Sequence, residues 1–294
     1  MPELPDVVVY IERLAAHLVG RELVRARMLN PFVLRSVDPA LAELEGRRVR
    51  DIRRLGKRIV FGFEADLFLV MHLMIAGRLR WLAPGGKPPG KISLAAFEFE
   101  HGMLVLTEAG SKRRASLHLV RGSEAVAGFD RGGLEPLEVG VDAFAERIRS
   151  ENRTLKRALT DPRLFSGIGN AYSDEILHRA RLSPLQHTAK LGDGAVATLY
   201  EATRAVLREW TERIRAEAGE GFPEKVTAFR EGMAVHGRFG EPCPVCGAPV
   251  QRIRYADNET NYCARCQTGG RVLADRSLSR LLGADWPRSI DELD

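Results

Sequence analysis

Four cysteines near one end of the chain constrain its fold more than any other feature of the sequence. Cys243, Cys246, Cys263 and Cys266 follow the pattern C-x2-C-x16-C-x2-C, and the rest of the chain contains no cysteine. This spacing lets two tight knuckles present four thiolates to a single tetrahedral Zn²⁺. Because four thiolates leave no open coordination position, we predict one structural zinc ion rather than a catalytic one. Disulfides are the alternative, and a cytosolic location disfavours them.

The length and composition describe an ordinary folded protein. The 294 residues are 45% hydrophobic and 28% charged, which predicts a globular chain with more than one domain. No run approaches the ~20 apolar residues that span a bilayer, and the start lacks the basic and apolar segments of an export signal. We therefore expect a cytosolic protein without a membrane span. The net charge of +5 favours a polyanionic partner, although many unrelated proteins are as basic.

The first part of the chain predicts a β-sandwich with one flanking helix. Residues 6–18 place apolar side chains near helical spacing, and Gly20 ends this helix. Short apolar or alternating runs follow, and they predict strands over residues 22–29, 49–53, 58–63, 67–73, 92–99, 103–107 and 116–120. Residues 38–46 predict a short capped helix between two of these strands. Residues 83–90 are rich in Pro and Gly and predict an exposed loop.

After about Gly140 the pattern changes to helical periods. We predict helices over residues 141–149, 154–160, 171–180 and 194–218. One more helix is expected in the tail, which carries Leu273, Leu278, Leu281 and Leu282. The expected fold class is therefore α+β and multidomain. We place a β-sandwich domain at residues 1–135, a helical domain at 140–235, a four-cysteine zinc finger at 236–268 and a C-terminal extension at 269–294.

The second and third residues, Pro2 and Glu3, offer a nucleophile and a proton carrier once the initiator Met1 is removed. The secondary amine of an N-terminal proline is partly neutral at cell pH, because the ordinary α-amino pKa is about 7.7–8.0. Attack of this amine on C1′ of a deoxyribose expels the base and leaves an iminium, which promotes elimination of the 3′ phosphate. Glu3 is placed to move protons in both steps. Taken alone, these two residues are an ordinary chain terminus.

Five separate segments carry motifs that argue against an ordinary chain terminus. They are Met-Pro-Glu-Leu-Pro-Asp-Val at the start, Leu55-Gly56-Lys57, His72-Leu73-Met74-Ile75-Ala76-Gly77, Phe165-Ser166-Gly167-Ile168-Gly169-Asn170-Ala171-Tyr172, and Gly237-Arg238 through Cys266. In this order they resemble the formamidopyrimidine-DNA glycosylase and endonuclease VIII family over about residues 1–268. The family's counterparts are its N-terminal proline, its β-hairpin lysine, its His-Leu-x-Met-x-Gly turn, its helix–two-turns–helix signature and its zinc finger.

The resemblance implies a bifunctional DNA glycosylase and AP lyase of base excision repair, which removes oxidised bases and nicks the strand through a Schiff base on Pro2. Glu3 is then the expected acid and base, and Lys57 is an expected phosphate ligand. Asn170 is a second phosphate ligand, since it follows a glycine-rich turn at the start of a predicted helix. The implied partner is damaged double-stranded DNA, bound by a monomer in a basic cleft between the domains.

Two loops that enter the DNA stack in this family are altered here. The family fills the space left by a flipped base with a Met from the His-Leu-x-Met turn and an Arg-Phe pair from a second loop. In this chain Ile75 stands at the Met position beside Met74, and residues 107–114 contain no aromatic side chain. Ile75 or Met74 is then the expected wedge, and Arg113 is the expected DNA ligand among the cations of the second loop.

The predicted zinc hairpin also departs from the family pattern. Asn258 stands where the family has an arginine that grips phosphates beside the lesion. An amide can hydrogen-bond a phosphate but adds no charge, so Arg252, Arg254 and Arg265 are candidates to compensate. We expect the hairpin to turn at Asp257 and Asn258.

Two narrower functions stay open beside the bifunctional enzyme. An AP lyase that excises no base is one of them, because imine chemistry survives the loss of a base pocket. A non-enzymatic damaged-DNA binder would account for the altered wedge residues. The intact Pro2 and Glu3 argue against a binder, which has no need of an N-terminal amine.

Overall fold

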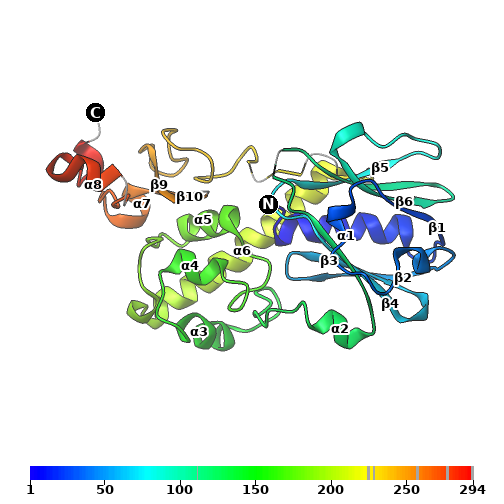
Figure 1. Ribbon diagram of the computed structural model, residues 1–294. Coiled ribbons are helices and arrows are strands. Elements are labelled where there is room, and N and C mark those ends of the chain that lie inside the picture. The colour runs from blue at the N-terminus through cyan, green and yellow to red at the C-terminus, as the bar shows by residue number, and fades with distance from the viewer. Residues whose placement is uncertain (111, 224–225, 228, 256–257, 276–277, 293–294) are drawn as a thin grey trace. The chain divides into compact units, whose positions relative to one another are not determined.

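The computed structural model describes residues 1–110, 112–223, 226–227, 229–255, 258–275 and 278–292. The chain forms two compact units, whose elements are labelled in Figure 1. The first unit contains Met1–Arg131 and Trp210–Thr227, and the second contains Gly132–Glu209 and Ala228–Asp294. The long helix α6 (Asp193–Ala218) contributes residues to both. The four-part division of the sequence stays a prediction.

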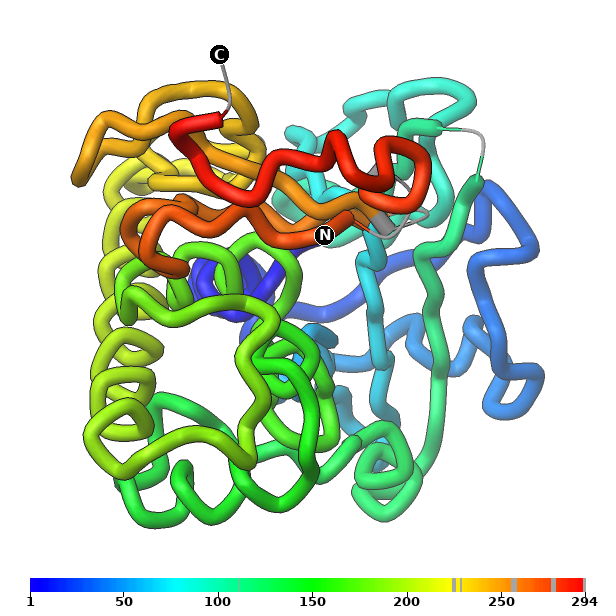
Figure 2. The backbone as a smooth tube through the Cα atoms, turned by 90° about the vertical axis from the view of Figure 1, so that its left-hand side faces the viewer, coloured from blue at the N-terminus to red at the C-terminus, as the bar shows by residue number. Residues whose placement is uncertain are grey.

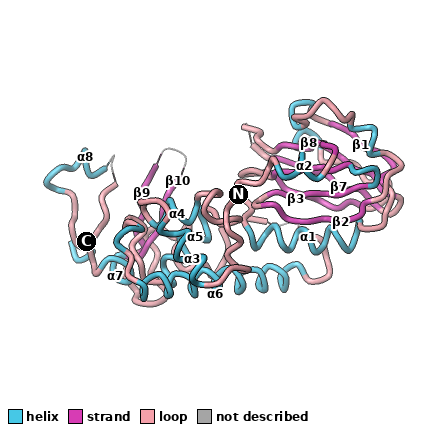
Figure 3. The backbone as a smooth tube through the Cα atoms, turned by 90° about the horizontal axis from the view of Figure 1, so that it is seen from below, coloured by secondary structure: helices cyan, strands magenta, loops and turns pink. Residues whose placement is uncertain are grey.

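Two antiparallel sheets of four strands each form the first unit (Figure 3). One sheet has the strand order β1-β6-β7-β5, made of β1 (Leu23–Met28), β6 (Ser93–Phe99), β7 (Gly102–Glu108) and β5 (Gly77–Leu82). The other has the order β2-β3-β4-β8, made of β2 (Val49–Leu55), β3 (Arg58–Phe63), β4 (Leu67–His72) and β8 (Ser116–Arg121). Three of the six neighbouring pairs, β2-β3, β3-β4 and β6-β7, are joined by short turns, which set their register.

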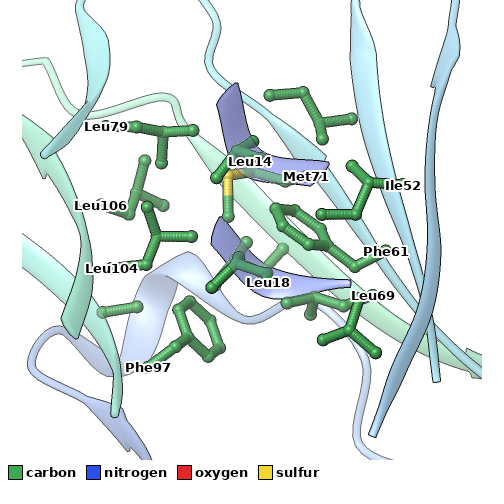
Figure 4. Close-up of a cluster of buried hydrophobic side chains, with 14 of the residues drawn as sticks. Leu14, Leu18, Ile52, Phe61, Leu69, Met71, Leu79, Phe97, Leu104 and Leu106 are labelled. Atoms are coloured by element: carbon green, nitrogen blue, oxygen red, sulfur yellow. The ribbon is translucent and has the colours of Figure 1, made fainter. Parts of the chain in front are cut away.

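Helix α1 (Leu4–Leu18) supplies the middle of the main core. Figure 4 shows its Leu14 and Leu18 between the inner faces of the two sheets. The sheet of β5, β6 and β7 contributes Leu79, Phe97, Leu104 and Leu106, and the other sheet contributes Ile52, Phe61, Leu69 and Met71. Both leucines of α1 are fully buried, so the apolar stripe read from the sequence is the face that enters the core.

The central strand β4 is buried on both faces, which explains its unbroken apolar sequence. Its Leu69 and Met71 face the main core. Its Phe68 and Val70 lie in a second cluster with Val126 of helix α2 (Ser123–Ala127). A strand that is covered on both sides has no solvent face to fill with polar residues.

The second unit begins with helices that pack through aromatic side chains. The helices are α3 (Val141–Arg149), α4 (Leu155–Thr160), α5 (Asn170–Arg179) and the first part of α6. The ring of Phe144 lies 4.7 Å from that of Phe165 and 5.5 Å from that of Tyr200, measured between ring centroids. These contacts hold the segment before α5 against α3 and α6.

A small hairpin, formed by β9 (Val250–Tyr255) and β10 (Asn258–Cys263) and followed by α7 (Ala264–Thr268), has its own core in the same unit. Buried Tyr262 packs there with Leu273 and Ile290 of the C-terminal tail. The Leu273 amide donates to the Tyr262 hydroxyl at 2.7 Å, and the Arg254 amide donates to the Asp275 carboxylate at 2.6 Å. Figure 2 shows the tail, coloured red, beside the hairpin. The tail is therefore part of the hairpin's core.

The structure confirms the predicted fold class, a β-sandwich with a flanking helix, a helical part and a cysteine-bearing hairpin. Residues 38–46, predicted as a short capped helix, contain a 3-10 helix at Leu41–Leu44, and the Glu43 side chain accepts a hydrogen bond from the Ala40 N–H at 3.0 Å. The sequence reading also missed β5, a strand of alternating arginines and apolar residues, and α2, a helix of five residues. The five residues of α2 are too few to show a helical period.

The prediction of a tail helix is confirmed, but its leucines do not form one buried face. Helix α8 covers Leu278–Leu282, and its Leu281 is 80% exposed. Leu273 lies before the helix and is buried against the hairpin. The expected turn of the hairpin includes Asp257, which is outside the described residues.

We expect Leu14→Ala to lower the free energy of unfolding of the first unit by about 2–5 kcal/mol, because it leaves a cavity in a close-packed core. Leu281→Ala is the matched control and should change stability by less than about 0.5 kcal/mol, since its side chain is already in water. Urea unfolding followed by tryptophan fluorescence reports mainly on the first unit, which holds Trp81 and Trp210. Equal shifts for the two variants would contradict the placement of α1 in the core.

Candidate functional site

The N-terminal residues are held at the start of α1. Glu3 is the N-cap residue of the helix, and its backbone N–H donates to the Asp6 carboxylate at 2.9 Å. Pro2, Glu3 and Asp6 are all buried. A carboxylate at this end of a helix is favoured by the helix dipole and by unpaired backbone N–H groups. The terminus is thus an ordered part of the fold rather than a loose end.

The N-terminal amine is largely removed from water. In this structure it belongs to Met1, one residue before Pro2. Burial lowers the pKa of the Met1 amino group below its ordinary value, and the nearby positive charges of Arg78 and Lys57 lower it further. Glu3 and Asp6 act in the opposite direction, because a negative charge favours the protonated amine. The structure therefore brings three predicted residues, Pro2, Glu3 and Lys57, into one electrostatic environment.

Lys57 occupies the second position of a two-residue β-turn. Leu55 of β2 pairs with Arg58 of β3, which leaves only Gly56 and Lys57 between the strands. Gly56 has φ +62°, a left-handed conformation that favours glycine in such hairpins. The Arg54 guanidinium donates to the Gly56 carbonyl at 2.8 Å and supports the turn. This geometry explains why a glycine precedes the lysine.

Basic side chains gather where β3 and β4 meet this turn. Arg58 and His72 are cross-strand partners. Burial lowers the pKa of His72 to about 4, and the charges of Arg58 and Lys57 add to the effect. Burial also lowers the pKa of His118. At neutral pH the two histidines are therefore neutral, and the positive charge here belongs to Lys57 and Arg58.

The turn that joins β4 to β5 presents Ile75 and not Met74. A Cβ atom on Gly77 would lie 2.2 Å from the Leu73 carbonyl oxygen, so this tight turn requires glycine. Met74 has φ +52°, and its Sδ lies 2.6 Å from His72 Nδ1, which turns the side chain back toward the strand. Ile75 is 54% exposed.

The second predicted loop begins beside this turn. Glu108, the last residue of β7, is the cross-strand partner of Gly77. Its buried carboxylate accepts hydrogen bonds from the backbone N–H groups of Arg114 at 2.9 Å and Ala115 at 3.0 Å, which closes the loop at its base. Arg113 is exposed and donates to the Lys91 carbonyl at 2.6 Å. Of the loop's residues, Ser111 is outside the described part of the chain.

In the second unit, Asn170 starts α5 after the turn that contains Gly167 at φ +81°. Its side-chain amide donates to the backbone carbonyl of Glu259 on β10 at 2.9 Å. The predicted phosphate ligand therefore already joins α5 to the hairpin. A phosphate at this position would compete with the Glu259 carbonyl for the same N–H group.

A buried network of charges supports the start of α5, and the sequence reading missed it. The Lys156 ammonium donates to the Asn170 carbonyl at 2.6 Å and to Asp174 Oδ1 at 2.5 Å. The other oxygen of Asp174 lies 2.8 Å from His236 Nδ1. Lys156 and Asp174 are both buried. The sequence gives little signal for this network, because both helices carry other charged residues beside Lys156 and Asp174.

Glu175 makes a second buried connection in this unit. Its carboxylate accepts hydrogen bonds from the backbone N–H groups of Ala234 at 2.7 Å, Val235 at 2.9 Å and His236 at 3.0 Å. Burial raises the pKa of Glu175, whereas these three hydrogen bonds favour its ionised form. The segment that leads into the hairpin is thereby held on α5.

Asn258 is exposed at the first position of β10, opposite Tyr255. Two of the three candidate arginines have other partners. Arg252 stacks over the Phe239 ring at 4.0 Å, and Arg265 lies 3.4 Å from the Asp291 carboxylate. Arg254 is exposed.

The four cysteines converge as their spacing predicts. Their sulfur atoms all lie within 4.8 Å of one another, with Cys246 Sγ 3.4 Å from Cys263 Sγ and Cys243 Sγ 3.9 Å from Cys266 Sγ. Tetrahedral Zn–S bonds of about 2.3 Å place sulfurs about 3.8 Å apart, so the quartet fits one zinc ion.

The surroundings of the quartet match a structural site. Burial raises the pKa of the Cys263 thiol to about 11, so a bound metal must displace its proton. His178 Nε2 lies 3.3 Å from Cys243 Sγ and orients this ligand from α5.

Among the described residues, every helix is too short or too polar to cross a membrane.

Comparison with known proteins places all three parts of this arrangement in one family. Residues 1–115 match the formamidopyrimidine-DNA glycosylase N-terminal domain, and residues 133–218 match the formamidopyrimidine-DNA glycosylase H2TH domain. Residues 240–269 match the zinc finger found in FPG and IleRS, which identifies the four cysteines as its zinc site.

Related proteins cover nearly the whole chain. A formamidopyrimidine-DNA glycosylase of Symbiobacterium thermophilum is 33% identical over 91% of this chain and 89% of its own length. An uncharacterized formamidopyrimidine-DNA glycosylase-like protein of Mycobacterium tuberculosis is 42% identical over 51% of this chain and 93% of its own length. The crystal structure of Lactococcus lactis Fpg with DNA that contains an abasic site superposes with a TM-score of 0.81 at 25% identity, covering 90% of this chain and 99% of that one. The chain therefore belongs to the formamidopyrimidine-DNA glycosylase family.

Proposed function

We propose that this protein is a bifunctional DNA glycosylase and AP lyase, which removes oxidised bases from duplex DNA and nicks the strand through its N-terminal proline. The single observation that carries the proposal is the setting of the N-terminal amine. Burial, together with two nearby cations, lowers the pKa of the Met1 amine against the opposing charges of Glu3 and Asp6, and only a neutral amine is a nucleophile. Removal of Met1 makes the nitrogen of Pro2 the terminal amine, and Pro2 is itself buried.

The proposed reaction uses one nucleophile for two bond cleavages. The Pro2 nitrogen forms a bond to C1′ of the damaged nucleotide as the bond from C1′ to the base breaks, and the base leaves with a proton. Loss of the amine proton and opening of the sugar ring give an iminium. Removal of a proton from C2′ then sends an electron pair toward the iminium, and the C3′–O bond breaks to release the 3′ phosphate.

Glu3 is the proposed proton carrier for both stages. It is buried at the same helix start as Pro2, and its charge acts directly on the terminal amine. As an acid it protonates the ring oxygen of the sugar, and as a base it accepts the C2′ proton. Family relatives include a Lactococcus lactis Fpg solved with Fapy-dG-containing DNA, which supports damaged DNA as the substrate class.

Five further residues are proposed to bind the DNA. Lys57, on its rigid turn, and Asn170, at the start of α5, are the proposed phosphate ligands. Ile75 is the proposed wedge in preference to Met74, because it is exposed on a tight turn whereas the Met74 sulfur lies on His72. Arg113 and Asn258 are exposed and stay candidate ligands.

The zinc ion would be held by Cys243, Cys246, Cys263 and Cys266. Bound zinc supplies no chemistry to the reaction, since four thiolates leave it without an open position. Its proposed role is to hold the hairpin that carries Asn258 and the Glu259 carbonyl.

Borohydride should trap a covalent adduct between residue 2 and an abasic-site duplex, because reduction of the iminium makes the bond permanent. A matched protein that carries two additional residues before Pro2 has its amine in an amide, and it should give no adduct while it still binds the DNA. Peptide mapping by mass spectrometry identifies the attached residue. An adduct on Lys57, or full activity of the extended protein, would show that Pro2 is not the nucleophile.

Ile75→Ala should slow base excision in duplex DNA by about tenfold or more, since unstacking a base step costs a few kcal/mol. Cleavage of a preformed abasic site should slow much less, because no base must be flipped. Met74→Ala, in the same turn, is the control and should have the smaller effect on excision. Single-turnover rates on both substrates test this, and equal losses for Ile75→Ala on the two would count against a wedge.

Metal analysis of protein purified without chelator should find about one zinc per chain. Stripping the metal, or Cys246→Ser, should loosen the hairpin and weaken DNA binding, because metal binding and folding of such a finger are coupled. Thermal unfolding and a binding titration with and without added zinc measure both effects. Protein that contains no zinc and binds DNA fully would refute this role.

A further inference from the structure

A pocket of about 480 Å³ opens on the first unit, away from any residue assigned above except Arg113. We call it the Phe32 pocket. Its lining consists of Asn30, Phe32, Val33, Arg35, Leu94, Gly110, Arg113 and Ala115. Val33, Leu94 and Ala115 are buried and form an apolar floor. The remaining residues make a polar and cationic rim, which is the usual make-up of a ligand site.

The pocket presents an aromatic ring to solvent from a rigid support. Phe32 is 77% exposed. The Asn30 side chain accepts a hydrogen bond from the Phe32 N–H at 3.0 Å, and the Asn30 N–H donates to the Leu94 carbonyl at 3.0 Å. The Arg35 N–H donates to the Leu117 carbonyl at 2.8 Å. The backbone on both sides of Phe32 is therefore held to the sandwich.

Two guanidinium groups give the pocket a positive charge. Arg113 is held across its rim by the bond to the Lys91 carbonyl, and Arg35 lies on the same segment as Phe32. Within the described part of the chain, neither group forms an ion pair with a carboxylate, and the described lining contains no acidic residue. An exposed ring beside two cations that pair with no described carboxylate suits a ligand that is both aromatic and anionic. A nucleotide has these two properties.

The chain topology places this pocket next to the proposed wedge. Gly110 and Arg113 belong to the loop that follows β7, and Glu108 at the end of β7 pairs with Gly77 of the wedge turn. A wedge that enters the lesion strand leaves the partner base without its hydrogen-bonding mate. That unpaired base can stack on an aromatic side chain that lies close to the wedge turn.

We infer that the Phe32 pocket binds the nucleobase opposite the damaged base. Phe32 stacks on the ring of this base, and Arg35 and Arg113 bind the phosphates of the same nucleotide. This inference rests on the proposed function. It also gives the chain an aromatic contact that the loop over residues 107–114 does not contain. The contact comes from a different segment, the 3-10 turn Pro31–Val33. The pocket would then determine which opposing base the protein prefers.

The test is a binding cycle with two uncleavable duplexes. Both carry a tetrahydrofuran abasic analogue, opposite adenine in one and opposite a second tetrahydrofuran in the other. Phe32→Ala should weaken binding of the first duplex by about 5- to 100-fold, the range for loss of one base–aromatic stack. It should leave binding of the second duplex unchanged, because there is no base to stack. Phe32→Trp should restore affinity for the first duplex.

Val37→Ala is the matched control, since Val37 is 94% exposed on the same segment and does not line the pocket. It should leave both affinities as in the unaltered protein. Equal losses for Phe32→Ala on the two duplexes, or no loss on either, would overturn the inference while the proposed function stands. Failure of the unaltered protein to prefer the abasic duplexes over undamaged DNA would overturn the proposed function and the inference with it.

Discussion

The burial of α1 between the two sheets determines where the N-terminal residues lie. Leu14 and Leu18 enter the core from the helix, and each fully buried leucine contributes about 1.5–3 kcal/mol to stability. The first residues of most chains are poorly ordered, because nothing ties them down. Here Glu3 is the N-cap residue of α1, and the Asp6 carboxylate accepts a hydrogen bond from the Glu3 N–H. The start of the chain is therefore held in one place by the fold.

The second unit depends on a comparable device made from buried charges. Asp174 and Glu175 are neighbours on α5, and each binds partners from the segment before the hairpin. The Lys156 ammonium is the positive partner of Asp174, and it also donates a hydrogen bond to the Asn170 carbonyl. Breaking one partner of such a buried set leaves an unpaired charge, which costs several kcal/mol. The start of α5 and the hairpin are therefore held together for any ligand that binds there.

Much of this arrangement is visible in the sequence. The cysteine spacing predicted the metal site, and the apolar periods predicted α1, α3, α6 and most strands, because both signals depend on residues close together in the chain. The network of Lys156, Asp174 and His236 joins residues far apart in the sequence and leaves no local spacing to detect. The sequence also could not show which of Met74 and Ile75 is exposed on the turn. This depends on the left-handed backbone of Met74 and the contact of its sulfur with His72.

We propose that the fold makes the terminal amine of Pro2 a neutral nucleophile near neutral pH. Burial lowers the pKa of the Met1 amino group, and Pro2 is buried as well. We therefore propose that the Pro2 amine, exposed by loss of Met1, is neutral at a lower pH than a terminal amine in water, whose pKa is about 8. The direct measurement is the single-turnover rate of strand cleavage at a preformed abasic site as a function of pH. We expect a rate that rises with pH and levels off below pH 8, in step with the titration of the Pro2 amine. A rate that still rises through pH 8 would contradict it, because the amine would then behave as one left in water.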